Sequence, residues 1–196
     1  MTWEKVKLGD VTDSCLGKML DQSKNTGIPR VYLRNINVRW FSFDLSDVKN
    51  LEKSLSDFIK ANEIVIDKFL HCAGILELLP AKSFDIDMCQ KIFNTNVFST
   101  MAIIKILIKK SNQKALKNVV FISALYSKKA VIGNSYYASS KGALDSYMRC
   151  IAKELAPNVR VNSILPGGIN TDITNTMTQE QKDAIEKNYP LGFGEK

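Results

Sequence analysis

The sequence has few of the residues that bind metals or build disulfide frameworks. Its 196 residues include one histidine, His71, and four widely separated cysteines, Cys15, Cys72, Cys89 and Cys150, with no Cys-x-x-Cys pair among them. We therefore expect no metal site and no set of disulfides. His71 ends an apolar run and stands beside no candidate nucleophile, which leaves few routes to a Ser-His-Asp or Cys-His hydrolase.

A long hydrophobic run and a secretion signal are also missing. The longest apolar stretch, residues 97–108, is interrupted by Ser99, Thr100 and Lys105 and falls short of the roughly 20 residues that a membrane span needs. The first ten residues mix charges and contain no apolar segment of a signal peptide. With 45% hydrophobic and 24% charged residues, the chain has the composition of a globular protein, and we expect it in the cytoplasm.

From residue 38 onward, short apolar runs alternate with longer helical stretches, which is typical of βαβ units around a parallel sheet. One helical stretch places Leu51, Leu55, Phe58 and Ile59 on a single face. The near-continuous apolar run at 118–124 predicts a strand buried on both faces. In full, the pattern predicts strands at 38–46, 67–74, 118–124 and 159–165, and helices at 47–63, 86–110, 135–156 and 178–188.

Tyr137 precedes Lys141 by four residues, so a helix would place both on one face, where the ammonium would lower the pKa of the phenol. Taken alone, this spacing is more often an ordinary solvated helix face, because it arises easily by chance. Other polar positions follow the expected strand ends, where ligands bind in open α/β sheets, so we expect them to converge. They are Asp44, "HCAG" at 71–74, Asn96 in a helix, Ser123, and "PGGINT" at 166–171.

This order of motifs, over about residues 38–196, resembles the short-chain dehydrogenase/reductase family. The resemblance implies a Rossmann-like α/β fold with a doubly wound parallel sheet flanked by helices. It implies hydride transfer between NAD or NADP and a small carbonyl or alcohol substrate, and a homo-oligomer formed through the helices that carry Asn96 and Tyr137. It assigns catalytic roles to Tyr137, Lys141, Asn96 and Ser123. It assigns cofactor contacts to Asp44, Leu45, His71, Cys72, Ala73, Gly74, Lys141, Pro166, Gly167, Ile169 and Thr171.

The sequence departs from the family pattern at two motifs. The family's Asn-Asn-Ala-Gly is His-Cys-Ala-Gly here, and Ala124 falls where the family has the serine that polarises the substrate carbonyl. Ser123 is one residue earlier, on a strand where neighbours point to opposite faces, so it serves only if the strand bends or bulges. The alternative is that Ser123 is a buried polar residue bonded to the backbone.

A larger departure lies at the amino terminus. Gly9, Gly17 and Gly27 are too widely spaced to form the family's Gly-x-x-x-Gly-x-Gly turn. Residues 1–47 instead resemble the start of a target-recognition domain in the specificity subunit of type I restriction-modification enzymes. We therefore expect a chimera, with a leader at 1–40 and a partial dehydrogenase domain at 41–196, and weak binding of NAD or NADP. Residues 30–36 are the best candidate for a replacement strand.

Two alternative functions follow from the same features. The net charge of +7 is spread along the chain and chooses no partner. A DNA-binding fragment would contact phosphates through basic residues of the leader, but nucleic acid is the less favoured partner because the leader is short. A non-catalytic scaffold would use the helices around Asn96 and Tyr137 for subunit pairing. In the DNA-binding alternative, the basic residues of the leader that would contact phosphates are Lys5, Lys7, Lys18, Lys24, Arg30, Arg34 and Arg39.

Overall fold

The computed structural model describes residues 43–112, 114–169 and 178–187. Residues 43–166 belong to one compact unit, whereas 167–169 and 178–187, with helix α7 (Gln179–Glu186), belong to another. The elements of the larger unit are α2 (Val48–Ala61), β1 (Lys68–His71), η1 (Ala81–Ser83), α3 (Ile86–Phe93), η2 (Asn94–Phe98), α4 (Ser99–Leu107), η3 (Lys110–Asn112), β2 (Asn118–Ile122), η4 (Leu125–Ser127), α5 (Ser135–Glu154) and β3 (Arg160–Ile164).

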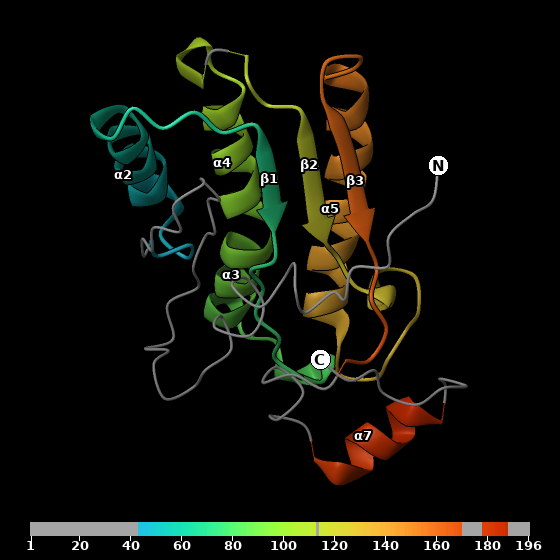
Figure 1. The fold of residues 1–196 in the computed structure, drawn as a ribbon. Coiled ribbons are helices and arrows are strands. Elements are labelled where there is room, and N and C mark those ends of the chain that lie inside the picture. The colour runs from blue at the N-terminus through green and yellow to red at the C-terminus, as the bar shows by residue number, and fades with distance from the viewer. Residues whose placement is uncertain (1–42, 113, 170–177, 188–196) are drawn as a thin grey trace, which may run out of the picture. The chain divides into compact units, whose positions relative to one another are not determined.

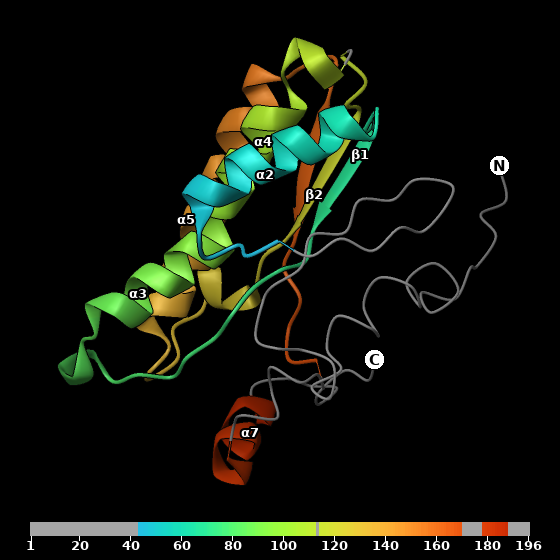
Figure 2. The same cartoon turned by 90° about the vertical axis from the view of Figure 1, so that its left-hand side faces the viewer.

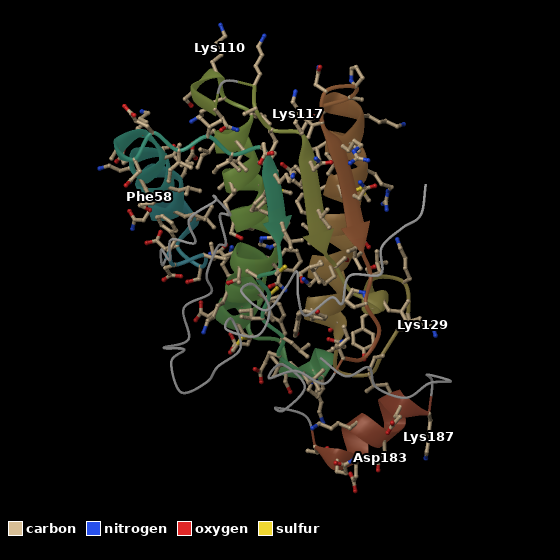
Figure 3. All side chains as sticks on the ribbon, viewed as in Figure 1. Phe58, Lys110, Lys117, Lys129, Asp183 and Lys187 are labelled. Atoms are coloured by element: carbon tan, nitrogen blue, oxygen red, sulfur yellow. The ribbon has the colours of Figure 1, made fainter. Side chains whose placement is uncertain are left out.

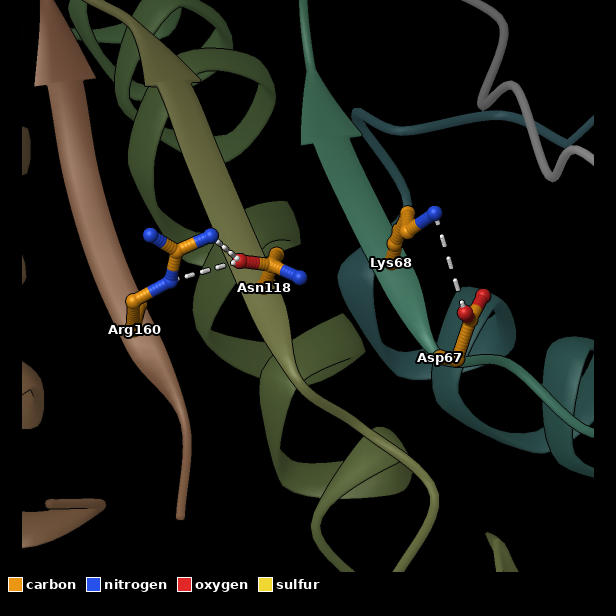
Figure 4. Close-up of polar contacts among 4 residues, drawn as sticks. All are labelled: Asp67, Lys68, Asn118 and Arg160. Atoms are coloured by element: carbon orange, nitrogen blue, oxygen red, sulfur yellow. Dashed lines mark hydrogen bonds and ion pairs between the residues drawn. The ribbon is translucent and has the colours of Figure 1, made fainter. Parts of the chain in front are cut away.

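The described strands form one parallel sheet in the order β1-β2-β3 (Figure 1). Lys68 lies opposite Asn118, and Asn118 lies opposite Arg160, so all three strands begin at the same level. Arg160 donates to Asn118 Oδ1 through Nε at 3.1 Å and Nη2 at 2.8 Å, while Lys68 lies 4.0 Å from Asp67 (Figure 4). The expected Rossmann-like parallel sheet is confirmed.

Among the described residues, α2, α4 and α5 all lie on one side of the sheet (Figure 2). Phe69, Val119 and Phe121 point to this side and form a core with residues of α4 and α5. Val120 and Ile122 alternate with them and are only half-buried. The expectation that β2 is buried on both faces was therefore wrong, because the described helices cover a single face of the sheet.

Helix α2 confirms the expected amphipathic pattern. The Asp47 side chain caps it by accepting a hydrogen bond from Asn50 N at 3.2 Å. Leu51, Leu55 and Ile59 are buried at a spacing of four residues, which places them on one helical face. This face packs toward α4 in the hydrophobic core.

The single helix expected over 86–110 is interrupted. Helix α3 ends at Phe93, a wider π-helical turn follows over Asn94–Phe98, and α4 begins at Ser99. Asn96 lies inside this turn and is fully buried. Such single π turns often mark functional sites, because the extra residue redirects side chains and carbonyls locally.

The strand expected over 38–46 is not formed in its described part, residues 43–46. Asp44 Oδ1 accepts hydrogen bonds from Ser46 N at 2.8 Å and from Ser46 Oγ at 2.7 Å, so the chain turns there instead of extending. The rest of that strand and the candidate strand at 30–36 lie outside the described residues. Within the described residues, no helix combines the length and apolarity that crossing a membrane requires.

Asn112 generates a prediction about stability. Its Oδ1 accepts from Ile66 N at 2.8 Å, and its Nδ2 donates to Ile66 O at 2.8 Å and to Leu107 O at 2.9 Å. Because Asn112 is 2% exposed, Asn112→Ala leaves these backbone groups buried without partners. We expect a loss of about 2–4 kcal/mol in the free energy of unfolding, measured by urea denaturation.

Asn62→Ala is the matched control for this prediction. The Asn62 amide is exposed and donates to Phe58 O at 2.9 Å, so water can replace that bond. Its removal is expected to cost less than about 1 kcal/mol. Equal losses in the two variants would contradict the assignment of Asn112 as a buried clamp.

Candidate active site

The candidate site lies where β1 and β2 end, near helix α5, which packs against β3 and η4. His71 is the last residue of β1, Cys72 to Gly74 follow it, and Ser123 follows β2. Carboxyl ends of parallel strands meet at one edge of a sheet, so these positions converge as expected. Lys129, just after η4, lies toward this end of the sheet, whereas Lys117 lies at the opposite end, where β2 begins (Figure 3).

Helix α5 presents one buried polar face to this edge. Tyr137, Lys141 and Asp145 follow one another at four-residue intervals, and their exposed fractions are 9%, 3% and 2%. The shared face of Tyr137 and Lys141 is confirmed. The interpretation of the pair as a solvated helix face is wrong, because both side chains are buried.

The Lys141 ammonium is fixed between the helix and the sheet. Its Nζ donates to Ile122 O at 2.9 Å and lies 5.6 Å from the centroid of the Tyr137 ring. Burial lowers the pKa of Lys141 to about 8, while electrostatic interactions with Cys72 and Asp145 raise it in part. At neutral pH the group is mainly cationic.

Burial raises the pKa of the Tyr137 phenol to about 12. This is opposite to the sequence-based expectation that Lys141 lowers it. The Lys141 ammonium is directed at the Ile122 carbonyl and lies over the ring, and loss of solvation around the phenol outweighs its charge. In this state Tyr137 is a neutral phenol at physiological pH.

Asn96 holds the loop after β1 in place. Its Oδ1 accepts from Ile75 N at 2.8 Å, and its Nδ2 donates at 3.0 Å both to Ile75 O and to Ser140 Oγ. A Cβ on Gly74 would lie 3.2 Å from Lys141 Nζ and 3.5 Å from Asn96 Oδ1. Glycine at this position therefore lets the loop approach the ammonium closely.

His71 packs into the core beneath the site. It is 2% exposed, and the Phe121 ring meets its imidazole edge-on with the centroids 6.4 Å apart. Burial and the Lys141 charge lower its pKa to about 3, so the imidazole is neutral. A cofactor contact at His71 would thus have to use the backbone. The Cys72 side chain is only partly buried, so a cofactor could contact it directly.

Ser123 has the geometry of a buried polar residue. Its Oγ donates to Lys141 O at 3.3 Å, and its N–H donates to Ile164 O at 2.8 Å and so continues the regular β2–β3 ladder. Ala124 follows in an extended conformation, with φ −156° and ψ 151°. The strand therefore carries no bulge at this point, and the Ser123 hydroxyl is engaged with the helix backbone.

The adenine-side candidates differ in exposure. Asp44 is exposed, and hydrogen bonds from the Ser46 side chain and backbone lower the pKa of its carboxyl group. Leu45 is fully buried in the core, so a ligand could meet it only through the backbone. Ala73, next to Gly74, is likewise part of the buried core.

The remaining candidates follow β3. Pro166 O accepts a hydrogen bond from Leu125 N at 3.0 Å, which joins the loop after β3 to the turn after β2. Gly167 and Ile169 are exposed and belong to the other compact unit. Thr171, like the basic residues of the leader, lies outside the described residues.

Sequence reasoning missed Asp145. Ser127 Oγ donates to its Oδ2 at 2.6 Å, and Ser163 Oγ donates to its Oδ1 at 3.2 Å. The signal was its position four residues after Lys141 on the same helical face. Among the described residues, no group of three or more His, Cys, Asp and Glu side chains is placed to hold a metal ion.

Comparison with known proteins gives the same family over most of the chain. The family model described as short chain dehydrogenase matches residues 20–182, so the match begins before residue 38, the start expected from the motifs. Carbonyl reductase family member 4 of Xenopus laevis is 33% identical over 159 residues, which cover 79% of this chain and 64% of that protein. The resemblance of residues 1–47 to a restriction specificity subunit stays a prediction.

Two further proteins extend the comparison. The human 3-oxoacyl-[acyl-carrier-protein] reductase is 30% identical over 161 residues, 79% of this chain and 65% of that protein. The structure of 4-hydroxyisoleucine dehydrogenase complexed with NADH has a TM-score of 0.72 at 26% identity and covers 79% of this chain and 65% of that chain. The chain thus spans just under two thirds of the length of these relatives. It belongs to the short-chain dehydrogenase family of oxidoreductases.

Proposed function

We propose that the chain is an NAD(P)-dependent oxidoreductase that reduces a small carbonyl compound or oxidises the corresponding alcohol. The observation that carries the proposal is the buried pair on α5, in which Lys141 Nζ contacts Ile122 O and lies over the Tyr137 ring. A buried ammonium beside a buried phenol is costly to maintain, and perturbed titratable groups of this kind concentrate at catalytic sites.

The residues around Lys141 fit a nicotinamide cofactor. Among described acceptors, Ile122 O takes one of the three Nζ donors, which leaves two for a cofactor hydroxyl. The absence of a side chain at Gly74 keeps the approach to the ammonium open. Asp44 and the backbone of Ala73 would bind other parts of the same cofactor. The choice between NAD and NADP is not made by these residues.

When bound, the nicotinamide supplies or accepts the hydride, and this chain's residues handle the proton. With a pKa of about 12, Tyr137 keeps its proton at neutral pH and suits the role of donor to the oxygen of a carbonyl that is being reduced. The Lys141 cation stabilises the phenolate that remains. The protonated phenol is the form of Tyr137 that reduction of a carbonyl needs.

We also propose that the protein forms a homo-oligomer through the helices that carry Asn96 and Tyr137, and that it acts in the cytoplasm. Apolar side chains on this part of the surface support the pairing. Phe84, next to α3, is 61% exposed and lies 5.9 Å, centroid to centroid, from Tyr136 at the start of α5. Phe98, in η2, is 39% exposed.

The function is tested by following nicotinamide absorbance with NADH and NADPH over a panel of carbonyl compounds. Tyr137→Phe is expected to lower turnover at least about 100-fold, because it removes the proton donor. Tyr136→Phe is the matched control and should retain turnover, because Tyr136 has Ser140 rather than a lysine four residues later. Turnover by neither cofactor in the unaltered chain would reject the proposal and favour the non-catalytic scaffold.

A second prediction concerns Ala124 and Ser123. Ala124→Ser places a hydroxyl on the face opposite Ser123, where the family's substrate-polarising serine is expected, and should raise kcat about tenfold or more. Ser123→Ala should leave kcat nearly unchanged, since that hydroxyl bonds the Lys141 carbonyl. The reverse result, with no gain from Ala124→Ser and loss from Ser123→Ala, would show that Ser123 contacts substrate.

A further inference from the structure

Asp145 joins three elements beneath the proposed site. It lies on α5 one turn after Lys141, and its two carboxylate oxygens accept hydrogen bonds from different elements. Ser127 Oγ, in η4, donates to Oδ2 at 2.6 Å, and Ser163 Oγ, in β3, donates to Oδ1 at 3.2 Å. The carboxylate therefore ties the turn after β2 and the last strand to the helix that carries Tyr137 and Lys141.

The turn held by Asp145 is also the turn that follows Ala124. Asp145 holds the last residue of this turn, Ser127. The first residue, Leu125, donates from its N–H to Pro166 O at 3.0 Å. The position at which a substrate-polarising side chain is expected is thus set by one bond to the helix and one bond to the loop after β3. Loss of the Ser127 contact would release the turn from α5.

The charge of Asp145 has no direct cationic partner among the ion pairs between described residues. A buried carboxylate held by neutral hydroxyls is unfavourable unless its charge is compensated nearby. Lys141 lies one helical turn away, and the interaction between the two charges favours the protonated ammonium.

The other groups that face Lys141 contribute differently. From β1 and its end come His71, which is neutral with a pKa of about 3, and Cys72, whose interaction with Lys141 also favours the ammonium. From α5 come Asp145 and Tyr137, which is neutral with a pKa of about 12. From β2 comes the uncharged carbonyl of Ile122.

We infer that Asp145 is a positioning residue of the site, which fixes the η4 turn against α5 and supplies a buried negative charge that favours the protonated form of Lys141. The relevance of this role to catalysis rests on the proposed function, but the contacts and the charge do not. The Lys141 pKa and the hydrogen-exchange rates of the η4 turn test the role of Asp145, whereas turnover tests the proposed function, so either can fail without the other.

The test is an NMR titration of the full chain labelled with ¹³C at the lysine ε-carbon. The Lys141 signal is assigned by its absence in Lys141→Met. Asp145→Asn keeps the shape and can still bond both serine hydroxyls, but it removes the charge. We expect the pKa of Lys141 to fall by about 0.3 unit or more, because removal of the anion favours the neutral amine. Glu154→Gln, an exposed charge change on the same helix, is the matched control and should leave it unchanged.

An unchanged pKa of Lys141 in Asp145→Asn would overturn the electrostatic part of the inference, as would an equal shift in Glu154→Gln. The positioning part has its own variant. Ser127→Ala is expected to speed hydrogen exchange at the Lys128 and Lys129 amides, which donate to Leu125 O at 2.9 and 3.0 Å, and to leave α5 amides unchanged. Exchange rates equal to those of the unaltered chain would overturn it, even if Asp145→Asn failed to fold.

Activity provides an independent comparison. If the chain reduces carbonyl compounds, the fall in turnover as Lys141 loses its proton, above about pH 8, should move to lower pH in Asp145→Asn. A profile that stays in place despite a lowered Lys141 pKa would overturn the link to catalysis. A lowered pKa with no turnover in any variant would support the inference and reject the proposed function.

Discussion

The site depends on the burial of one ammonium group between helix α5 and the edge of the sheet. Lys141 reaches across to the last residue of β2 and donates to the Ile122 carbonyl at 2.9 Å. Glycine at position 74 favours this contact, since a Cβ there would lie 3.2 Å from Nζ and would press on the ammonium. Asn96 fixes the loop after β1 beside this ammonium through both backbone polar groups of Ile75. The end of β2 and the loop after β1 thus both lie next to one cation.

The same burial shifts the pKa values of Tyr137 and Lys141 in opposite directions. Loss of solvation disfavours charge, so it raises the pKa of Tyr137 and lowers that of Lys141. The result is a phenol that keeps its proton and an ammonium that keeps most of its charge at neutral pH. Titratable groups whose environments separate their pKa values in this way are suited to acid–base chemistry. Electrostatic interactions with Cys72 and with the Asp145 carboxylate limit the fall in the Lys141 pKa.

Much of this arrangement is predictable from the sequence, where a regular period determines the outcome. The spacing of Leu51, Leu55 and Ile59 predicts the buried face of α2, and the four-residue spacing predicts that Tyr137 and Lys141 share a face. The convergence of strand ends follows from the parallel sheet. The features that the sequence did not reveal depend on local hydrogen bonds or on packing. The Ser46 bonds to Asp44 form a turn at residues 44–46, where the sequence predicts the end of a strand, and the direction of the Tyr137 pKa shift is decided by burial.

We propose that the Lys141 ammonium is one of the groups that bind the nicotinamide cofactor, and this role carries the proposed function. Calorimetric titration of the chain with NADH and with NADPH, compared with Lys141→Met, tests it most directly, since methionine has a similar length and no charge. The account predicts saturable binding of at least one cofactor, even if weak, and an affinity at least about tenfold lower in Lys141→Met, because hydrogen bonds to charged groups contribute about 1.5–3 kcal/mol. Equal affinity in the two proteins, or no binding to the unaltered chain, would contradict it.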